Sequence, residues 1–184
     1  MDLMPFDELN RFEAALPMYY ENGRIKSREA YEDILDEMLD LFLLAYANGV
    51  VATNEALGTD YSPTVDEVMK TVDKQIVGKN WRERMQEHLD NGGTIADVIR
   101  IAETETHRDA NAAAYETAKR AGATTKTWHT MLDDRVRDTH TYLEGVTAPL
   151  DGEFYSFMGG STMYPGEWGI AEEDINCRCW LTYK

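Results

Sequence analysis

The sequence predicts an α+β fold, with a mostly helical N-terminal body and a small C-terminal α+β unit. This unit is expected to hold a short antiparallel sheet, one short helix and a Gly/Pro-rich loop. In the first two-thirds of the 184 residues, apolar side chains recur at helical spacing. After residue 124 the chain becomes richer in β-branched and aromatic residues, which favour strands. Glycine and proline then gather between residues 145 and 170, where they favour turns.

Apolar periodicity and capping residues place the helices of the first part. Ser27 is suited to cap a long helix that Gly58 ends. At 1.5 Å per residue this helix is roughly 45 Å long, more than a lone core requires. Capping boxes open two shorter helices, at Thr64 with Glu67 and at Asn80 with Glu83. The expected helices cover residues 6–16, 27–57, 64–77, 80–91 and 94–121.

The C-terminal third is expected to alternate strands, turns and one helix. Residues 124–130 favour a strand, and residues 133–143 favour a short helix that stops at Gly145. Residues 175–183 alternate as in a buried strand, which should pair with the strand at Trp128. We therefore divide the chain into an acidic N-terminal helical extension (1–62), a helical body (63–125) and a small α+β unit (126–184).

Charge and composition exclude several classes of function. The chain carries 34 acidic and 18 basic residues, a net charge of −16, which repels phosphate backbones and anionic lipid. No apolar run approaches the ~20 residues of a membrane span, and the N-terminus lacks the pattern of a signal peptide. Two cysteines are too few for a disulfide framework. We expect a reduced compartment, no membrane and no direct nucleic-acid binding.

The predicted short helix places four polar side chains on one stripe: Asp133, Arg137, His140 and Glu144. Such a cluster beside a Gly-rich loop can bind an anion or perform acid–base chemistry. The structural alternative is favoured, because most such clusters are architectural: Arg137 pairs with Asp133, and His140 is hydrogen-bonded beneath the loop. Burial distinguishes the two, because a catalytic pair of Arg137 and His140 should line an open cleft.

Cys177 and Cys179 point the same way from the predicted strand, and His129 or His140 can approach them. Two thiolates with imidazole would suit Zn²⁺, with His140, Cys177 and Cys179 as the candidate ligands. The alternative is two reduced, buried cysteines that pack as small apolar side chains. A one-residue separation differs from the usual zinc knuckle, so we expect no cofactor and keep zinc as the second possibility.

Several segments, taken together, resemble the phage Mu protein F-like minor head proteins. The helix sequence Ile-Ala-Glu-Thr-Glu at 101–105 is similar to the Ile-Ala-x-Thr-Glu of that family, which more often has arginine where this chain has Glu103. The resemblance covers roughly residues 65–182. It continues through Trp128-His129-Thr130, Asp133, Asp134, Val136-Arg137, His140, Leu143-Glu144-Gly145, Phe154, Gly159-Gly160, Pro165-Gly166 and Ile175-Asn176-Cys177-Arg178-Cys179.

The resemblance implies a virion protein of tailed double-stranded DNA phages or prophages. Such proteins serve head morphogenesis in few copies, associate with the portal or inner capsid, and offer no established catalytic mechanism. We interpret the matching positions as a structural signature of the C-terminal unit, and we expect no catalytic residue. The signature consists of Trp128, Asp133, Arg137, His140, Gly145, Asn176, Cys177, Arg178 and Cys179.

An assembly protein should present a docking surface, and the long helix of residues 27–57 is the first candidate. Its apolar stripe predicts contacts with portal, capsid or scaffold proteins, or with a second copy of the chain. The stripe consists of Tyr31, Ile34, Leu35, Met38 and Phe42. The function predicted is therefore that of a minor head protein, made in the host cytoplasm and carried in the virion, with a role in packaging or ejection left open. The alternative is an ejected nucleotide- or nucleic-acid-modifying effector that uses Arg137 and His140.

Overall fold

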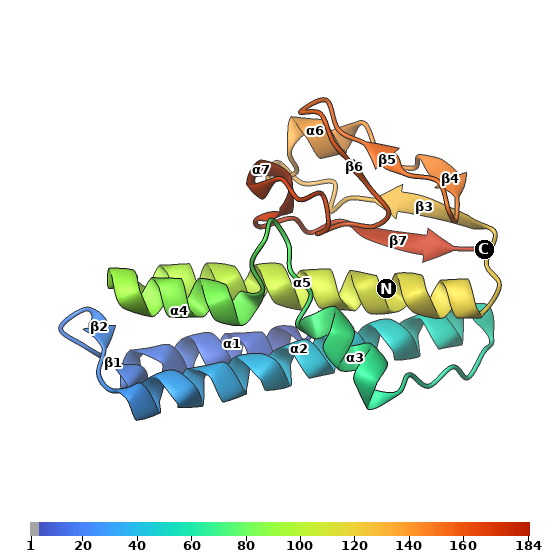
Figure 1. Cartoon of the computed structure of the whole chain (residues 1–184). Coiled ribbons are helices and arrows are strands. Elements are labelled where there is room, and N and C mark those ends of the chain that lie inside the picture. Colours follow the sequence, from blue (N-terminus) through green and yellow to red (C-terminus); the bar gives the residue numbers. More distant parts are fainter. Residues whose placement is uncertain (1–3) are drawn as a thin grey trace.

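The computed structural model describes residues 4–184 and has two layers (Figure 1). The first three residues of the predicted segment 1–62 lie outside the described part. A small unit of short strands, short helices and loops lies on one side of a layer of helices. The helical layer contains α1 (Phe6–Ala15), α2 (Arg28–Leu57), α3 (Val65–Val72), α4 (Trp81–Asn91) and α5 (Ile95–Arg120). The predicted α+β fold class is confirmed.

The two long helices, α2 and α5, lie along each other, with α5 between α2 and the C-terminal unit. They approach closely at Gly49 of α2, where an added Cβ would overlap the carbonyl oxygen of Ala110 and lie 2.9 Å from the Cβ of Ala113. A glycine on one helix and alanines on the other therefore permit the contact. This explains why α5 is rich in alanine along its second half.

The predicted helix starts are confirmed by their caps. The Ser27 hydroxyl accepts from the amide of Ala30 at 3.0 Å, and Gly58 ends α2 with φ +67°. Both predicted capping boxes are present, at Thr64 and at Asn80. These local signals are read correctly because each involves residues close in sequence.

One helical prediction extends too far, and another agrees with the structure to within one residue. The helix expected over 64–77 ends at Val72, and Ile76 instead forms an antiparallel bridge with Lys79 around Val77, whose φ is +54°. The first helix ends at Ala15 and continues as a 3₁₀ turn, η1 (Leu16–Tyr19). A two-residue hairpin, β1 (Tyr20–Glu21) with β2 (Arg24–Ile25), then leads into α2.

One apolar core joins the helices of residues 4–120. Its buried members come from α1, η1, α2, α3, α4 and α5, and the rings of Phe42 and Trp81 meet edge-on with centroids 5.1 Å apart. The predicted segments 1–62 and 63–125 therefore share a core. The stripe expected to dock with partners is part of it: Tyr31, Ile34, Leu35, Met38 and Phe42 are 0–7% exposed. The folded chain buries this stripe against its own helices, which corrects the docking expectation for these side chains.

The C-terminal unit contains a three-stranded antiparallel sheet in the order β4–β3–β7. Its strands are β3 (Thr125–His129), β4 (Thr147–Pro149) and β7 (Trp180–Tyr183), and Trp128 lies opposite Leu181. The predicted pairing of the last strand with the strand at Trp128 is confirmed. A second, two-stranded sheet pairs β5 (Phe154–Tyr155) with β6 (Ser161–Thr162).

The predicted helix over 133–143 is mostly wrong. Only α6 (Asp138–Thr141) is helical, because Leu132 has φ +54° and Arg137 is extended, with ψ 147°. The predicted strand over 175–183 is also too long. The helix α7 (Ala171–Asp174) precedes it, and Asn176 adopts φ +58°, so the regular strand begins at Trp180. In both segments, tertiary contacts of polar side chains replace regular structure.

Candidate functional site

A buried group of two cysteines and one histidine lies inside the C-terminal unit. His140 comes from α6, and Cys177 and Cys179 come from the segment between α7 and β7. The Nδ1 atom of His140 is 3.6 Å from the Sγ of Cys177 and 3.5 Å from the Sγ of Cys179. The three side chains are 1–4% exposed. We refer to them as the Cys–His cluster.

The start of the segment that carries the cysteines is held by contacts to its backbone. Asn176 adopts a left-handed conformation, which asparagine tolerates better than most residues. The amide of Cys177 donates to the carbonyl of Asp174 at 3.2 Å. The guanidinium of Arg137 donates to the carbonyl of Ile175. These contacts turn both thiols toward His140.

Glu173 faces the other side of the histidine ring. Its Oε2 lies 3.0 Å from Nε2 of His140, an ion-pair distance that is not aligned as a hydrogen bond. The same carboxylate accepts from the hydroxyls of Thr139, at 2.7 Å, and Ser156. Glu173 is 1% exposed, so its carboxyl group lies away from water. The ring of His140 is therefore positioned between a carboxylate and two sulfur atoms.

Aromatic rings enclose the Cys–His cluster. Trp168 stacks on His140 with centroids 5.8 Å apart, and Trp128 meets the same ring nearly edge-on at 5.7 Å. Phe154 packs against Trp128 at 5.0 Å. These rings exclude water, and this raises the free-energy cost of any polar group left without a partner.

The interaction between the two thiols separates their acidities. It raises the pKa of Cys177 well above the ordinary thiol value, with burial adding to the rise. The same contact lowers the pKa of Cys179, against the opposing effect of burial. Cys179 is therefore the thiol of this pair that ionises first. Both cysteines are free, with no disulfide between them.

The predicted polar stripe on the short helix does not form, because residues 133–137 are not helical. Asp133 makes two hydrogen bonds to Arg178, at 2.6 and 2.8 Å, in place of the expected pair with Arg137. Glu144 accepts from the hydroxyl of Thr130 at 2.8 Å. The four predicted side chains are thus divided among separate contacts.

The other signature residues have structural positions. Trp128 is fully buried at the centre of the aromatic wall. Gly145 has φ +74°, and its amide donates to the carbonyl of Trp128 at 2.9 Å, closing the turn between α6 and β4. All nine predicted signature residues therefore lie in the C-terminal unit, in the Cys–His cluster or in the segments that lead to it. Their structural role remains a prediction until variants test it.

A buried ionic network lies on α5. The helical position of Glu105 in the sequence is compatible with a solvated face or with an inter-helix ionic face. In the structure Glu105 is 1% exposed and pairs with Arg108 at 2.9 Å and with Arg84 of α4, so the ionic face forms. Arg108 also pairs with Asp109 at 2.7 Å, and burial raises the pKa of Asp109 to about 8. These residues are covered because α5 is sandwiched between the other helices and the C-terminal unit. The sequence feature that could have indicated their burial is the alanine-rich stretch that directly follows Glu105, Arg108 and Asp109.

A contact that the sequence pattern does not reveal joins α5 to the segment of the cysteines. The Nδ2 atom of Asn111 lies 3.3 Å from the carbonyl oxygen of Cys179 and 3.2 Å from Nε2 of His107. Burial lowers the pKa of His107 to about 4, so this ring stays neutral at pH 7. The helical layer therefore supports the Cys–His cluster from below.

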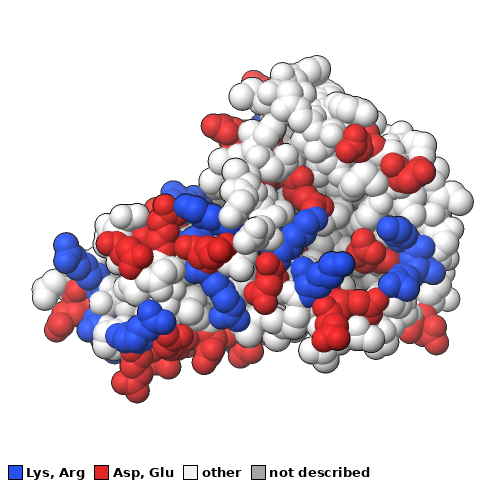
Figure 2. Space-filling model, viewed as in Figure 1, with Lys and Arg blue, Asp and Glu red and all other residues white. Residues whose placement is uncertain are grey.

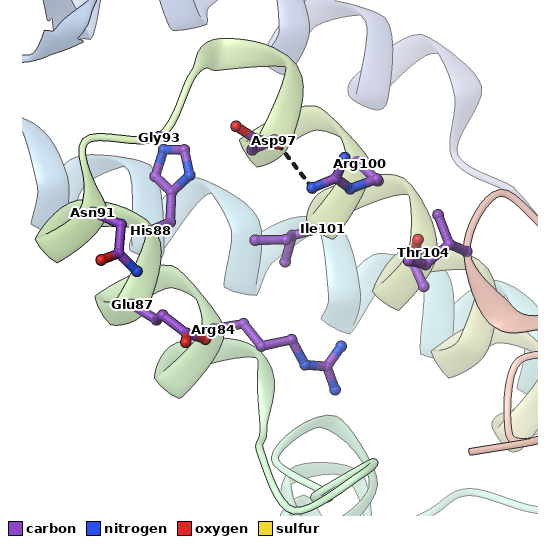
Figure 3. A pocket seen from close by; sticks show the side chains of 10 residues that line it. Arg84, Glu87, His88, Asn91, Gly93, Asp97, Arg100, Ile101 and Thr104 are labelled. Carbon is purple, nitrogen blue, oxygen red and sulfur yellow. Dashed lines mark hydrogen bonds and ion pairs between the residues drawn. The ribbon is translucent and has the colours of Figure 1, made fainter. Parts of the chain in front are cut away.

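A groove lies elsewhere, between α4 and α5 (Figure 3). It encloses about 350 Å³, and its walls carry charged side chains from both helices, among them Arg84, Glu87, Asp97 and Arg100. Asp97 pairs with Arg100 at 2.7 Å. Neither Arg137 nor His140 lines this groove. His140 is 1% exposed, which differs from the open position that a catalytic Arg137–His140 pair requires.

Comparison with known proteins identifies the family. Residues 64–182 match the family model described as Phage Mu protein F like protein. Minor head protein GP7 of Bacillus phage SPP1 is 31% identical over 150 residues, which cover 80% of this chain and 41% of GP7. NAD(+)--arginine ADP-ribosyltransferase EFV of Enterococcus faecalis is 32% identical over 124 residues, which cover 62% of this chain and 25% of that enzyme.

The chain thus spans less than half the length of either relative. No solved structure matches it. Within residues 4–184, no helix combines the length and the apolar character that crossing a bilayer requires. The family match extends from the cap of α3 to the last strand and includes every residue of the Cys–His cluster. The chain belongs to the Phage Mu protein F like family.

Proposed function

We propose that the chain is a minor head protein that acts structurally in the heads of a tailed double-stranded DNA phage or prophage. The observation that carries this proposal is the 31% identity to minor head protein GP7 over 80% of the chain. The partners are portal, capsid or scaffold proteins, and assembly takes place in the host cytoplasm. A contribution to packaging or ejection of DNA belongs to the same proposal.

The placement of polar side chains supports a structural role over a catalytic one. Arg137 binds a backbone carbonyl within the unit, and His140 is buried between Glu173 and the two thiols. A reactive pair needs access to a substrate, and these contacts use both side chains inside the fold. The similarity to the ADP-ribosyltransferase covers only 25% of that enzyme. We therefore favour a protein without enzymatic activity over the ejected effector.

The surface also suits protein partners better than nucleic acid. Figure 2 shows acidic and basic side chains interspersed over the helical layer, whereas the C-terminal unit shows a few acidic side chains and very little basic surface on this face. The net charge is −16. Binding to a phosphate backbone requires a concentration of basic side chains. Contacts with other head proteins have no such requirement.

The experiment is to purify heads with the chain present and with its gene deleted, and to cross-link the complete heads before mass spectrometry. We expect the chain in purified heads in few copies, cross-linked to portal or capsid protein, and defective assembly without it. A chain that is absent from purified heads, with normal head yield after deletion, would contradict the proposal. Incubation of the purified chain with NAD⁺ and an arginine-containing protein tests the enzymatic alternative, and we expect no transfer.

A further inference from the structure

We propose that the Cys–His cluster binds a zinc ion through Nδ1 of His140 and the sulfur atoms of Cys177 and Cys179. The three donor atoms all lie within 4.8 Å of one another. They come from α6 and from the segment before β7, which are separated by more than thirty residues of chain. A bound ion would therefore cross-link the two ends of the C-terminal unit.

The distances agree with zinc coordination. Zinc binds sulfur at about 2.3 Å and imidazole nitrogen at about 2.0 Å, and a tetrahedral angle between such bonds separates the two donor atoms by roughly 3.5 Å. The observed separations from Nδ1 of His140 are 3.5 Å and 3.6 Å. An ion can thus contact all three donors with little movement of the chain. The donor set, two thiolates and one imidazole, is one that selects zinc over magnesium and calcium.

Glu173 supplies a second, independent observation. A histidine that binds a metal through one ring nitrogen usually presents the other to a carboxylate, which fixes the ring and makes it a stronger ligand. The Oε2 atom of Glu173 lies 3.0 Å from Nε2 of His140, on the side of the ring away from the sulfur atoms. Two hydroxyls hold this carboxylate in place, from Thr139 and Ser156. Among the ion pairs of residues 4–184, Glu173 has His140 as its partner and no lysine or arginine.

The surrounding charges also fit. Two thiolates and the Glu173 carboxylate outweigh the charge of a zinc ion by one. Arg137 and Arg178 are close enough to act electrostatically on the thiols. No fourth histidine, cysteine, aspartate or glutamate of the described residues joins the cluster. With three protein ligands in a buried site, the ion would serve to hold the unit together.

Metal analysis of the full-length protein tests the proposal. The protein is purified under reducing conditions, supplied with zinc, dialysed and analysed by mass spectrometry for bound metal. We expect one zinc ion per chain, and a lower melting temperature after removal of the ion by a chelator. Replacement of zinc by Co²⁺ should give the absorption bands of thiolate–cobalt charge transfer.

Variants then assign the ligands. Cys177→Ser and Cys179→Ser should each lose the zinc and the charge-transfer bands. Glu173→Gln should keep the fold but bind zinc about 10–100-fold more weakly, because it weakens the support of the ligand ring. His129→Gln is the matched control: it changes a histidine of the same unit outside the cluster and should retain the ion.

The zinc content and melting temperature of the wild-type protein test the proposal by themselves, so the test holds even if a serine variant fails to fold. Substoichiometric zinc in wild-type protein supplied with the ion, or a melting temperature unaffected by chelator, would overturn the proposal. Full zinc content in both folded cysteine variants would do the same. The cysteines would then be thiols that hydrogen-bond to His140 within the core.

Discussion

The helical layer and the C-terminal unit are stabilised in different ways. The helices share an extensive apolar core, in which ordinary side chains such as Ile34, Met38 and Phe42 repeat at helical spacing. The C-terminal unit has strands of two to five residues and depends on single polar contacts, such as Arg137 with the carbonyl of Ile175. Its core mixes tryptophans with two cysteines and a buried histidine.

This difference shows what each kind of sequence pattern can specify. An apolar stripe tolerates changes of similar size, because many interchangeable contacts contribute. A small unit with short strands has less area to bury, and its individual polar contacts must each be satisfied. The helical layer should therefore respond to loss of volume, and the C-terminal unit to loss of specific atoms.

The largest effect is expected for Phe42→Ala in the helical layer. Phe42 is fully buried against Trp81, so its truncation leaves a cavity and should lower the free energy of unfolding by about 3–5 kcal/mol. Denaturation by urea, followed by circular dichroism, measures this loss. The control is Leu44→Ala on the same helix, where the side chain is 37% exposed and the expected loss is below about 1 kcal/mol.

This pair of variants also decides the role of the α2 stripe. If Phe42→Ala leaves stability unchanged but prevents incorporation into heads, the stripe is a docking surface and the assignment to the core is wrong. Stability loss in solution, before any partner is added, supports the core assignment.

The next effect concerns the contact between the two regions, at His107. The folded chain keeps this ring neutral, with a pKa of about 4, whereas an unfolded histidine titrates near its ordinary value of 6.5. Between these values the unfolded chain binds the additional proton, so stability is fully present above pH 6.5 and falls as the pH drops toward 4. The limiting loss is roughly 3 kcal/mol, from 1.36 kcal/mol per pKa unit.

Unfolding of wild-type protein and of His107→Gln, measured in urea from pH 4 to 8, isolates this contribution. The variant should show a smaller loss of stability on acidification than the wild type. Asp109 titrates with the opposite sign, since its raised pKa of about 8 makes stability decrease from pH 4 to pH 8. That change is common to both proteins and cancels in the difference. Parallel pH curves would contradict the assignment to His107.

The sequence predicts the helical layer better than the candidate site. Caps such as Thr64 with Glu67 are local, and the period of α2 identifies its buried side chains correctly. The same period does not reveal what covers a stripe, which is why Phe42 was expected to face a partner. The C-terminal unit is harder, because contacts over 34 to 45 residues, such as Asp133 with Arg178 and Thr139 with Glu173, decide where helix and strand end.

The smallest effect is expected for Arg178→Lys, and it refines the comparison within the C-terminal unit itself. Arg178 pairs with Asp133, but the two side chains are 31% and 35% exposed, so solvent screens the pair. The expected loss is below about 1 kcal/mol and should shrink further in high salt.

Arg137→Lys provides the comparison, because Arg137 donates to the backbone carbonyl of Ile175 beside the cysteines. A lysine cannot reproduce the planar guanidinium contact, so we expect about 1–2 kcal/mol, with little dependence on salt. Urea midpoints of both variants at low and high ionic strength measure the two effects. If Arg178→Lys costs more than Arg137→Lys, the exposed pair contributes more to the unit than the partly buried backbone contact does. Stability of the C-terminal unit would then depend on its surface charges, and the distinction between the two arginines would fail.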